Sequence, residues 1–153
     1  MSSVPVATVE ILNDLLDAEL NSVFRFMGEG SPYLSKATAE VRKPLQEMVN
    51  TIPRRTREIA DLIDSLGGVP TPRNIQPEEQ YLAFLSLKFL LPKLVHEKNL
   101  AIRRLQNAIA GIRSAPERPP EVMQLLESHL AELQRELGAL EQATKHVTPT
   151  PSH

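Results

Sequence analysis

The sequence predicts an all-α protein, a bundle of four helices with one long crossover connection. Apolar residues recur at intervals of three and four, the period of an amphipathic helix, and no segment shows the alternation typical of a β-strand. Two of the predicted connections between helices are short, and the third is long and contains prolines 70, 72 and 77. We therefore expect two antiparallel helix pairs joined by a crossover.

The first helix is predicted from Val9 to Met27, and residues 1–8 are expected to form a flexible N-terminus. Gly28, Gly30 and Pro32 end the helical pattern. Its apolar stripe contains Ile11, Leu12, Leu15, Leu16, Val23 and Phe26.

The second helix is predicted from Ala37 to Leu66, with Gly67 and Gly68 as a left-handed C-terminal cap. Pro44 and Pro53 lie within it, so at least one kink is expected. Its apolar stripe contains Val41, Leu45, Met48, Ile52, Ile59, Leu62 and Leu66.

The third helix is predicted from Glu78 to Arg113, with a bend at Pro92, and the fourth from Glu121 to Ala143. The fourth is entered through Pro119 and Pro120. Residues 144–153 are expected to form a disordered tail, because they are polar and contain proline. The two stripes comprise Leu87, Leu91, Leu94, Leu105, Ile109 and Ile112, and then Val122, Leu126, Leu130, Leu133, Leu137 and Leu140.

The connection from Gly67 to Pro77 determines the topology. A helix of about 28 residues is about 42 Å long, and about twelve extended residues span about 40 Å. This connection is therefore long enough to travel the length of the bundle, which a simple up-down arrangement would not require.

Composition indicates one soluble domain, residues 9–143, in a chain of 153 residues with 41% hydrophobic residues and a net charge of −2. A net charge this close to zero gives no indication of binding to nucleic acid or to an anionic membrane. The chain has no cysteine, so disulfides and thiol chemistry are excluded. The most apolar stretch, 81–95, is interrupted by two lysines and a proline, so a membrane span is not expected. With no secretion signal at the start, we expect a cytoplasmic protein.

Polar residues lie on the apolar face of each predicted helix near mid-height: Glu19, Arg55, Lys98 and His129. A buried carboxylate is costly unless it is paired, hydrogen-bonded or coordinated to a metal. The alternative without a functional role is that long side chains such as Lys98 and Arg55 reach outwards to solvent. Glutamate is shorter, so this alternative is weaker for Glu19. The function depends on whether a metal or an ion pair occupies the centre.

Four stretches carry a family resemblance. They are Leu15-Leu16-Asp17-Ala18-Glu19-Leu20, Leu66-Gly67-Gly68-Val69-Pro70, Arg104-Leu105-Gln106-Asn107-Ala108-Ile109 and His129-Leu130-Ala131-Glu132-Leu133-Gln134-Arg135-Glu136-Leu137. With them the chain resembles the ferritin-like superfamily, and bacterioferritins in particular, over residues 9 to 143. In that family two irons are held by one glutamate from each of two helices and by an E-x-x-H pair from each of the other two.

Carried over position by position, the resemblance leaves only Glu19 and His129 as residual ligand positions. Leu126 occupies the position where the family has the glutamate of the E-x-x-H pair that ends at His129. The resemblance therefore retains two of the six ligands that the family's site requires.

The remaining ligand positions carry Ile52, Arg55 and Lys98. Guanidinium has no lone pair to offer a metal, and an ammonium group would first have to lose its proton. The position that matches the family's haem-ligating methionine carries Pro53. We therefore expect no cofactor and no metal site, with Arg55 and Lys98 replacing the iron and neutralising Glu19, and His129 hydrogen-bonded nearby.

These residues favour a non-catalytic ferritin-like protein with a structural or interaction role, and the family resemblance implies a homo-oligomer. The alternative is an iron-binding protein, a ferroxidase or iron store, with a rearranged site that uses Glu19, His129 and acids such as Glu97 or Glu58. A third hypothesis is that the cationic centre binds a small anion. The pair Glu127 and Glu132 is expected to lie on a solvated outer face.

Overall fold

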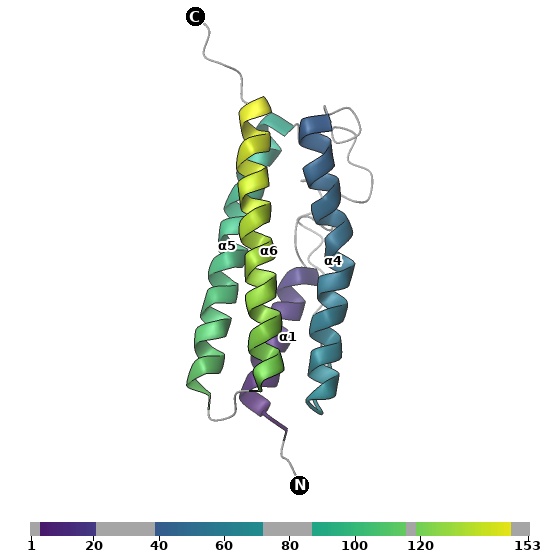
Figure 1. The fold of residues 1–153 in the computed structure, drawn as a ribbon, viewed down its shortest axis with the longest axis vertical. Helices are drawn as coiled ribbons and strands as arrows, with labels where there is room; N and C mark the ends of the chain where they lie inside the picture. Colours follow the sequence, from purple (N-terminus) through teal and green to yellow (C-terminus); the bar gives the residue numbers. More distant parts are fainter. Residues whose placement is uncertain (1–3, 21–38, 72–86, 116–118, 148–153) are drawn as a thin grey trace, which may run out of the picture.

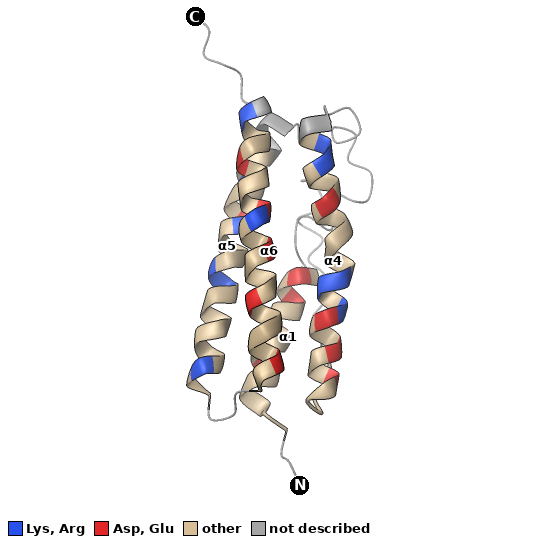
Figure 2. Ribbon diagram, viewed as in Figure 1, with Lys and Arg blue, Asp and Glu red and all other residues tan. Residues whose placement is uncertain are grey.

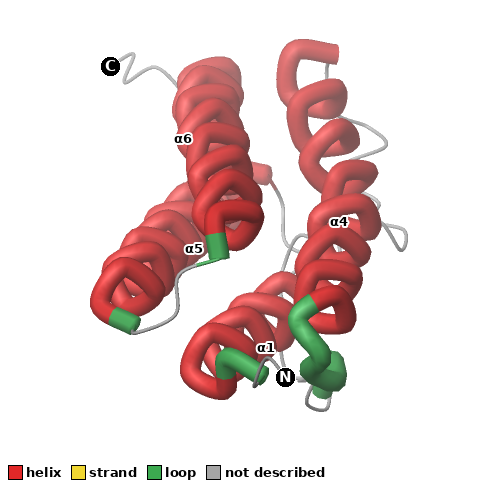
Figure 3. The backbone as a smooth tube through the Cα atoms, turned by 60° about the horizontal axis from the view of Figure 1, so that its bottom comes forward, coloured by secondary structure: helices red, strands yellow, loops and turns green. Residues whose placement is uncertain are grey.

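A computed structural model describes residues 4–20, 39–71, 87–115 and 119–147 of the chain. The regular elements within these ranges are the α-helices α1 (Val6–Leu20), α4 (Ala39–Ser65), α5 (Leu87–Ser114) and α6 (Pro120–Val147) (Figures 1 and 3). The predicted all-α, four-helix architecture is confirmed.

The helices are arranged with the crossover topology that the sequence predicts. α1 and α6 run in one direction, and α4 and α5 run in the other (Figure 1). α4 packs against α1 and α6, and α5 packs against the same two helices. Each helix therefore has antiparallel neighbours. Because α4 and α5 are parallel, both helices begin at the same end of the bundle.

Two predicted boundaries are corrected by the structure. α1 begins at Val6, so residues 6–8 are helical and do not belong to a flexible N-terminus. α6 continues to Val147, so residues 144–147 are helical as well. The hydroxyl of Thr144 donates a hydrogen bond to the carbonyl of Leu140 at 2.8 Å, which accommodates a polar residue inside the helix. The predicted segments 21–27, 78–86 and 148–153 lie outside the described residues.

The core consists of two apolar clusters along the bundle. One joins α4, α5 and α6 and is centred on Val41, Leu45, Leu91, Leu94 and Leu140. The other joins all four helices and includes Leu12, Leu16, Ile63, Ile112 and Leu126. Most predicted stripe residues are buried. Five of them, Ile11, Leu62, Leu66, Leu130 and Leu137, are only partly buried, and Ile63, which the predicted stripe omits, is fully buried.

The end of α4 forms the predicted glycine cap. The backbone N–H of Gly68 donates to the carbonyl of Ile63, and the N–H of Gly67 donates to that of Asp64, both at 3.0 Å. Gly67 has a φ of 85°. These are the two hydrogen bonds of a Schellman motif, in which the residue after the C-cap takes the left-handed conformation.

The predicted prolines occupy positions inside the helices, Pro44 and Pro53 in α4 and Pro92 in α5. The kinks expected at them stay a prediction. None of the described helices combines the length and apolar character needed to cross a lipid bilayer.

Candidate functional site: a buried network of ion pairs

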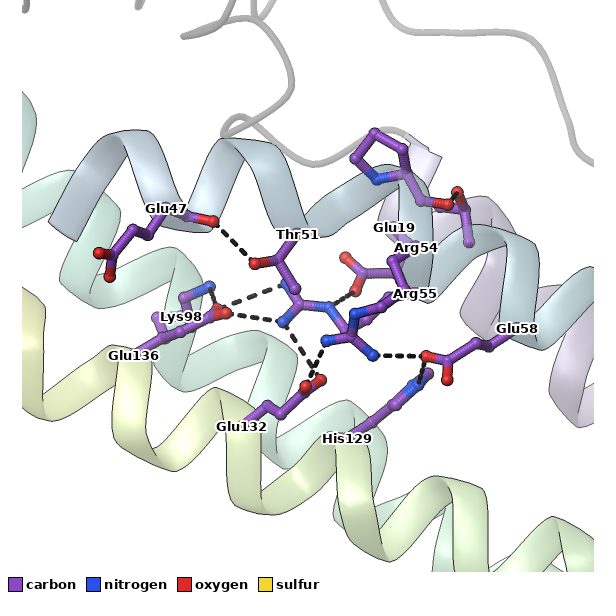
Figure 4. A network of polar contacts seen from close by, with 12 residues as sticks. Glu19, Glu47, Thr51, Arg54, Arg55, Glu58, Lys98, His129, Glu132 and Glu136 are labelled. Carbon is purple, nitrogen blue, oxygen red and sulfur yellow. Dashed lines mark hydrogen bonds and ion pairs between the residues drawn. The ribbon is translucent and has the colours of Figure 1, made fainter. Parts of the chain in front are cut away.

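Charged side chains form a polar layer between the two apolar clusters (Figure 4). Arg55 lies on α4 between Ile52 of one cluster and Ile59 of the other, and Lys98 lies between Leu94 and Ile102 on α5. Arg55, Lys98 and His129 are 1%, 3% and 3% exposed, which makes them core residues. The alternative that Arg55 and Lys98 reach out to solvent is therefore wrong.

Arg55 is the hub of this layer. Its Nε donates to Glu19 Oε1 on α1 at 2.6 Å. Its two terminal nitrogens donate to Glu136 on α6, with Nη1 2.7 Å from Oε2 and Nη2 3.4 Å from Oε1. The planar guanidinium group thus meets the Glu136 carboxylate with its fork, a geometry that lysine cannot provide.

Glu136 also accepts a hydrogen bond from the second buried cation. Lys98 Nζ on α5 lies 2.6 Å from Glu136 Oε1. The carboxylate of Glu136 therefore lies between Arg55 and Lys98. This is the place that the anion-binding hypothesis assigns to a small anion. An acidic side chain of the protein itself supplies the negative charge there.

A second branch of the network lies nearer the surface. Arg54 pairs with Glu58 at 2.7 Å and also with Glu132 on α6. His129 Nε2 lies 3.0 Å from Glu58 Oε1. Glu132 is also 3.8 Å from Arg55 Nη1, which links the two branches. Together the branches connect α1, α4, α5 and α6.

The pKa values show which charges the layer stabilises. Burial disfavours ionised Glu136, but Lys98 and Arg55 outweigh burial and lower its pKa. Burial also opposes the charge on Arg55, and here Glu19 and Glu136 raise the pKa above its ordinary value. For Lys98 burial dominates and lowers the pKa despite Glu136, and the nearby Arg55 charge adds to that effect.

The helices contribute unequal charges to this layer. In the described residues α1 carries only acidic charged side chains, and α5 carries mainly basic ones (Figure 2). In the layer itself the acids come from α1, α4 and α6, and the cations from α4 and α5. Its attractions therefore run between helices as well as within α4, and they oppose the separation of the helices that they connect.

The predicted polar residues lie in one layer, but their partners differ from those expected. Arg55 contacts Glu19 as anticipated, whereas Lys98 contacts Glu136 and His129 contacts Glu58. The interpretation of Glu132 as a solvated outer residue is wrong, because its side chain is 18% exposed and pairs with two arginines. Glu127, the other residue of that pair, has a side chain that is 55% exposed.

Sequence reasoning missed Glu136, the carboxylate with two buried cationic partners. A signal for it was present: Glu132 and Glu136 follow His129 by three and seven positions. Residues at these intervals share one face of a helix. Leu133 and Leu137, which directly follow these two acids, belong to the predicted apolar stripe, so the acids lie at its edge.

The described residues of the layer do not supply the donor set of a di-iron centre. Ile52 and Leu126, at positions where the resemblance would place ligands, are 5% and 0% exposed and belong to the apolar clusters. Arg55 and Lys98, at two other such positions, are cationic side chains, which do not bind metal ions. No cluster of three or more histidine, cysteine or acidic residues suited to a metal ion occurs among the described residues.

Comparisons with known proteins show the fold and nothing narrower. No protein-family model matches the chain, and no curated protein matches it in sequence. A bacterioferritin of Desulfovibrio desulfuricans, described for its di-iron site in different catalytic states, matches with a TM-score of 0.76 at 16% identity, over 96% of this chain and 85% of that chain.

Two further solved structures support the same conclusion. A protein from Xanthomonas campestris pv. campestris has a TM-score of 0.71 at 17% identity and covers 95% of this chain and 93% of that one. A mutant of Dps1 from Mycobacterium smegmatis has a TM-score of 0.59 at 16% identity, over 90% and 97%. The resemblance noted in the sequence is thus confirmed at the level of the ferritin-like four-helix fold.

Proposed function

We propose that this chain, which has the ferritin-like fold, is a non-catalytic structural or interaction protein in which a buried ion-pair network replaces a metal centre. The observation that carries the proposal is the placement of Glu136 between Arg55 and Lys98, with contacts of 2.7 and 2.6 Å. Those two cations stand at positions where the family has a histidine and a glutamate as ligands.

Electrostatics supports the replacement of the metal. Iron ions would be repelled by Arg55, which keeps its proton because Glu19 and Glu136 raise its pKa. Glu19, a residual ligand position, already accepts a hydrogen bond from Arg55 Nε at 2.6 Å. A metal bound to Glu19 would have to displace this hydrogen bond. The buried guanidinium group of Arg55 would then lose one of the carboxylates that balance its charge.

The network supports a structural role because its bonds run between helices. Arg55 joins α4 to α1 and α6, and Lys98 joins α5 to α6. Such bonds have directional geometry, unlike contacts between apolar side chains. We infer that the layer fixes the axial register of the four helices, a role for which buried polar groups are known in other helical assemblies.

The decisive experiment measures the iron content of the purified protein. The chain is expressed with iron supplied, purified without chelator and analysed by inductively coupled plasma mass spectrometry. We expect far less than one iron per chain, because the ligand positions carry cations and apolar residues. About two tightly bound irons per chain, as in a di-iron site, would overturn the proposal.

The second candidate is an iron-binding protein with a rearranged site. The observation in its favour is that Glu19, Glu97 and His129 line one cavity, while Glu58 contacts His129 at 3.0 Å. The same metal analysis separates the two candidates. If iron is found, Glu97→Ala and Glu58→Ala would each lower the iron content under this alternative.

We also propose that the chain forms a homo-oligomer, by analogy with ferritin-like proteins, and that no resident cofactor is required. Sedimentation velocity of the full chain measures the assembly directly.

A further inference from the structure

A cavity of about 170 Å³ lies between α1 and α5, beside the ion-pair layer. Its apolar wall is formed by Leu15, Ala18, Ile59, Ala101, Leu105 and Leu133. Ala18 on α1 and Ala101 on α5 contribute only methyl groups where the longer neighbours Leu15 and Leu105 fill space. The alanines therefore leave room between the two helices.

The charges around the cavity balance. Glu19 and Glu97 contribute two acids, and Lys98 and Arg104 contribute two bases. Lys98 already donates to Glu136, and the remaining polar residue, His129, contacts Glu58. An ionic ligand would therefore gain no net attraction and would lose its hydration on entry. The balance favours a neutral ligand.

Glu19 provides a hydrogen-bond acceptor at the cavity. Its Oε1 accepts from Arg55, and its Oε2 has no hydrogen-bond partner among the described residues. Figure 4 shows this second oxygen directed away from Arg55. A carboxylate offers acceptor sites on both oxygens. Hydrogen bonds to a charged acceptor are stronger than those between neutral groups.

We infer that this cavity binds a small neutral ring compound that carries one O–H or N–H donor, as phenols do. The donor bonds to Glu19, and the ring packs against Ala18, Ala101 and Leu133. The size is suitable, because an apolar cavity of about 150 Å³ in another protein holds benzene. This inference rests on the proposed function, because the alternative iron site would use the Glu19 carboxylate and the same cavity.

The test is a titration of the full chain with phenol, in which binding is measured by isothermal titration calorimetry and by changes in the amide chemical shifts. Ala101→Leu places an isobutyl group in the cavity and should weaken phenol binding at least about tenfold. Ala110→Leu is the matched control, because it makes the same change at an exposed position of the same helix. It should bind phenol as the unmodified chain does.

Toluene provides the second measurement, since it has the shape of phenol without the donor. Phenol should bind about tenfold more tightly than toluene if its O–H reaches Glu19. This order needs no variant, so it decides the role of Glu19 even if the substituted chains fail to fold. Toluene binding as tight as phenol would overturn the assignment.

Two other results would also overturn the inference. One is the absence of phenol binding at concentrations up to about 10 mM. The other is unchanged binding in a folded Ala101→Leu chain, checked by circular dichroism. Ala18→Leu fills the cavity from α1 and should give the same loss as Ala101→Leu.

Discussion

Glu136 is the residue on which the buried charges depend most. It contacts both Arg55 and Lys98 within 2.7 Å, whereas Glu19 contacts Arg55 alone among these two cations. Removing one partner from a buried ion pair leaves an uncompensated charge in the core, which costs much more than the pair itself contributes. The two acids should therefore differ in their effects on stability.

Glu136→Ala should lower the free energy of unfolding by about 3–5 kcal/mol, because it removes the buried carboxylate that Lys98 and Arg55 share. Glu19→Ala should cost about 1–3 kcal/mol, since Arg55 keeps its bonds to Glu136. Urea unfolding followed by circular dichroism measures both. Glu141→Ala, at an exposed position of α6, the helix that contains Glu136, should change the free energy of unfolding by less than about 0.5 kcal/mol.

A Glu136→Ala loss under about 1 kcal/mol would contradict this ranking, because it would place the layer in effective contact with water. Equal losses for Glu136→Ala and Glu19→Ala would contradict the assignment of Glu136 as the shared partner.

Stability should also depend on pH through Glu136. Lys98 and Arg55 hold its folded-state pKa below the ordinary value of 4.5, so the unfolded chain takes up a proton first as the pH falls. The stabilisation is complete above 4.5 and is lost as the pH falls through the folded-state pKa. Denaturant unfolding at about pH 6 and about pH 3.5 should show the loss.

Glu136→Gln is the comparison for this pH effect, because glutamine cannot titrate. The variant should be less stable near neutral pH and should lose less stability on acidification. An identical acid slope in both proteins would show that other carboxylates cause the dependence.

At the scale of single elements, the end of α4 shows how a short sequence signal determines local structure. Gly67 has a φ of 85°, where residues other than glycine are disfavoured. A Cβ on Gly68 would lie 2.7 Å from Val9 Cγ1, so α1 packs against the backbone at this turn. The Gly67-Gly68 pair thus serves both the cap and the contact between α4 and α1.

Gly67→Ala should lower the free energy of unfolding by about 1–2 kcal/mol, because it forces a Cβ into the left-handed region. Gly138→Ala on α6 should raise it by about 0.5–1 kcal/mol, since that glycine is helical and a Cβ there meets nothing within 4 Å. Thermal and urea unfolding of the two variants should therefore move in opposite directions. A stabilising Gly67→Ala would contradict the cap geometry.

At the scale of the whole molecule, the bundle keeps its architecture at very low sequence identity. The match to the bacterioferritin has a TM-score of 0.76 at 16% identity. Helix length, apolar periodicity and the direction of each helix are enough to preserve such a bundle, because many apolar side chains fill the same core. The residues of the central layer are not specified by these requirements.

Our prediction at this scale is that the bundle can be given a di-iron site. Ile52→Glu, Arg55→His, Lys98→Glu and Leu126→Glu would introduce the ligand pattern that the resemblance to ferritin-like proteins implies. Glu136→Gln is needed as well, because Glu136 would otherwise lose both cationic partners. The combined variant should bind about two irons per chain and oxidise ferrous iron in air, measured by metal analysis and by absorbance.

The matched control for the restored site is the four-substitution variant that retains Glu136. Without iron it should be less stable than the five-substitution variant, because Glu136 then carries an unpaired buried charge. A folded five-substitution variant that binds no iron would show that the helices are not placed as a di-iron centre requires.

The sequence alone predicted the helical class, the crossover and the glycine cap, because these follow from local rules. Periodicity shows which face of a helix is apolar, and Gly67-Gly68 marks the end of α4 whatever lies beside it. The same reasoning identified Arg55, Lys98 and His129 as polar residues on apolar faces. Boundaries were less accurate, since α1 begins at Val6 and α6 ends at Val147.

Only the tertiary structure decided which charge meets which. The pairing of Lys98 with Glu136, and of His129 with Glu58, depends on the rotation and axial shift of each helix relative to its neighbours. A pattern along one chain contains no direct record of these shifts, and a displacement of one turn, about 5.4 Å, would exchange every partner. The sequence by itself therefore determined the bundle and its buried charges, and packing determined the network that they form.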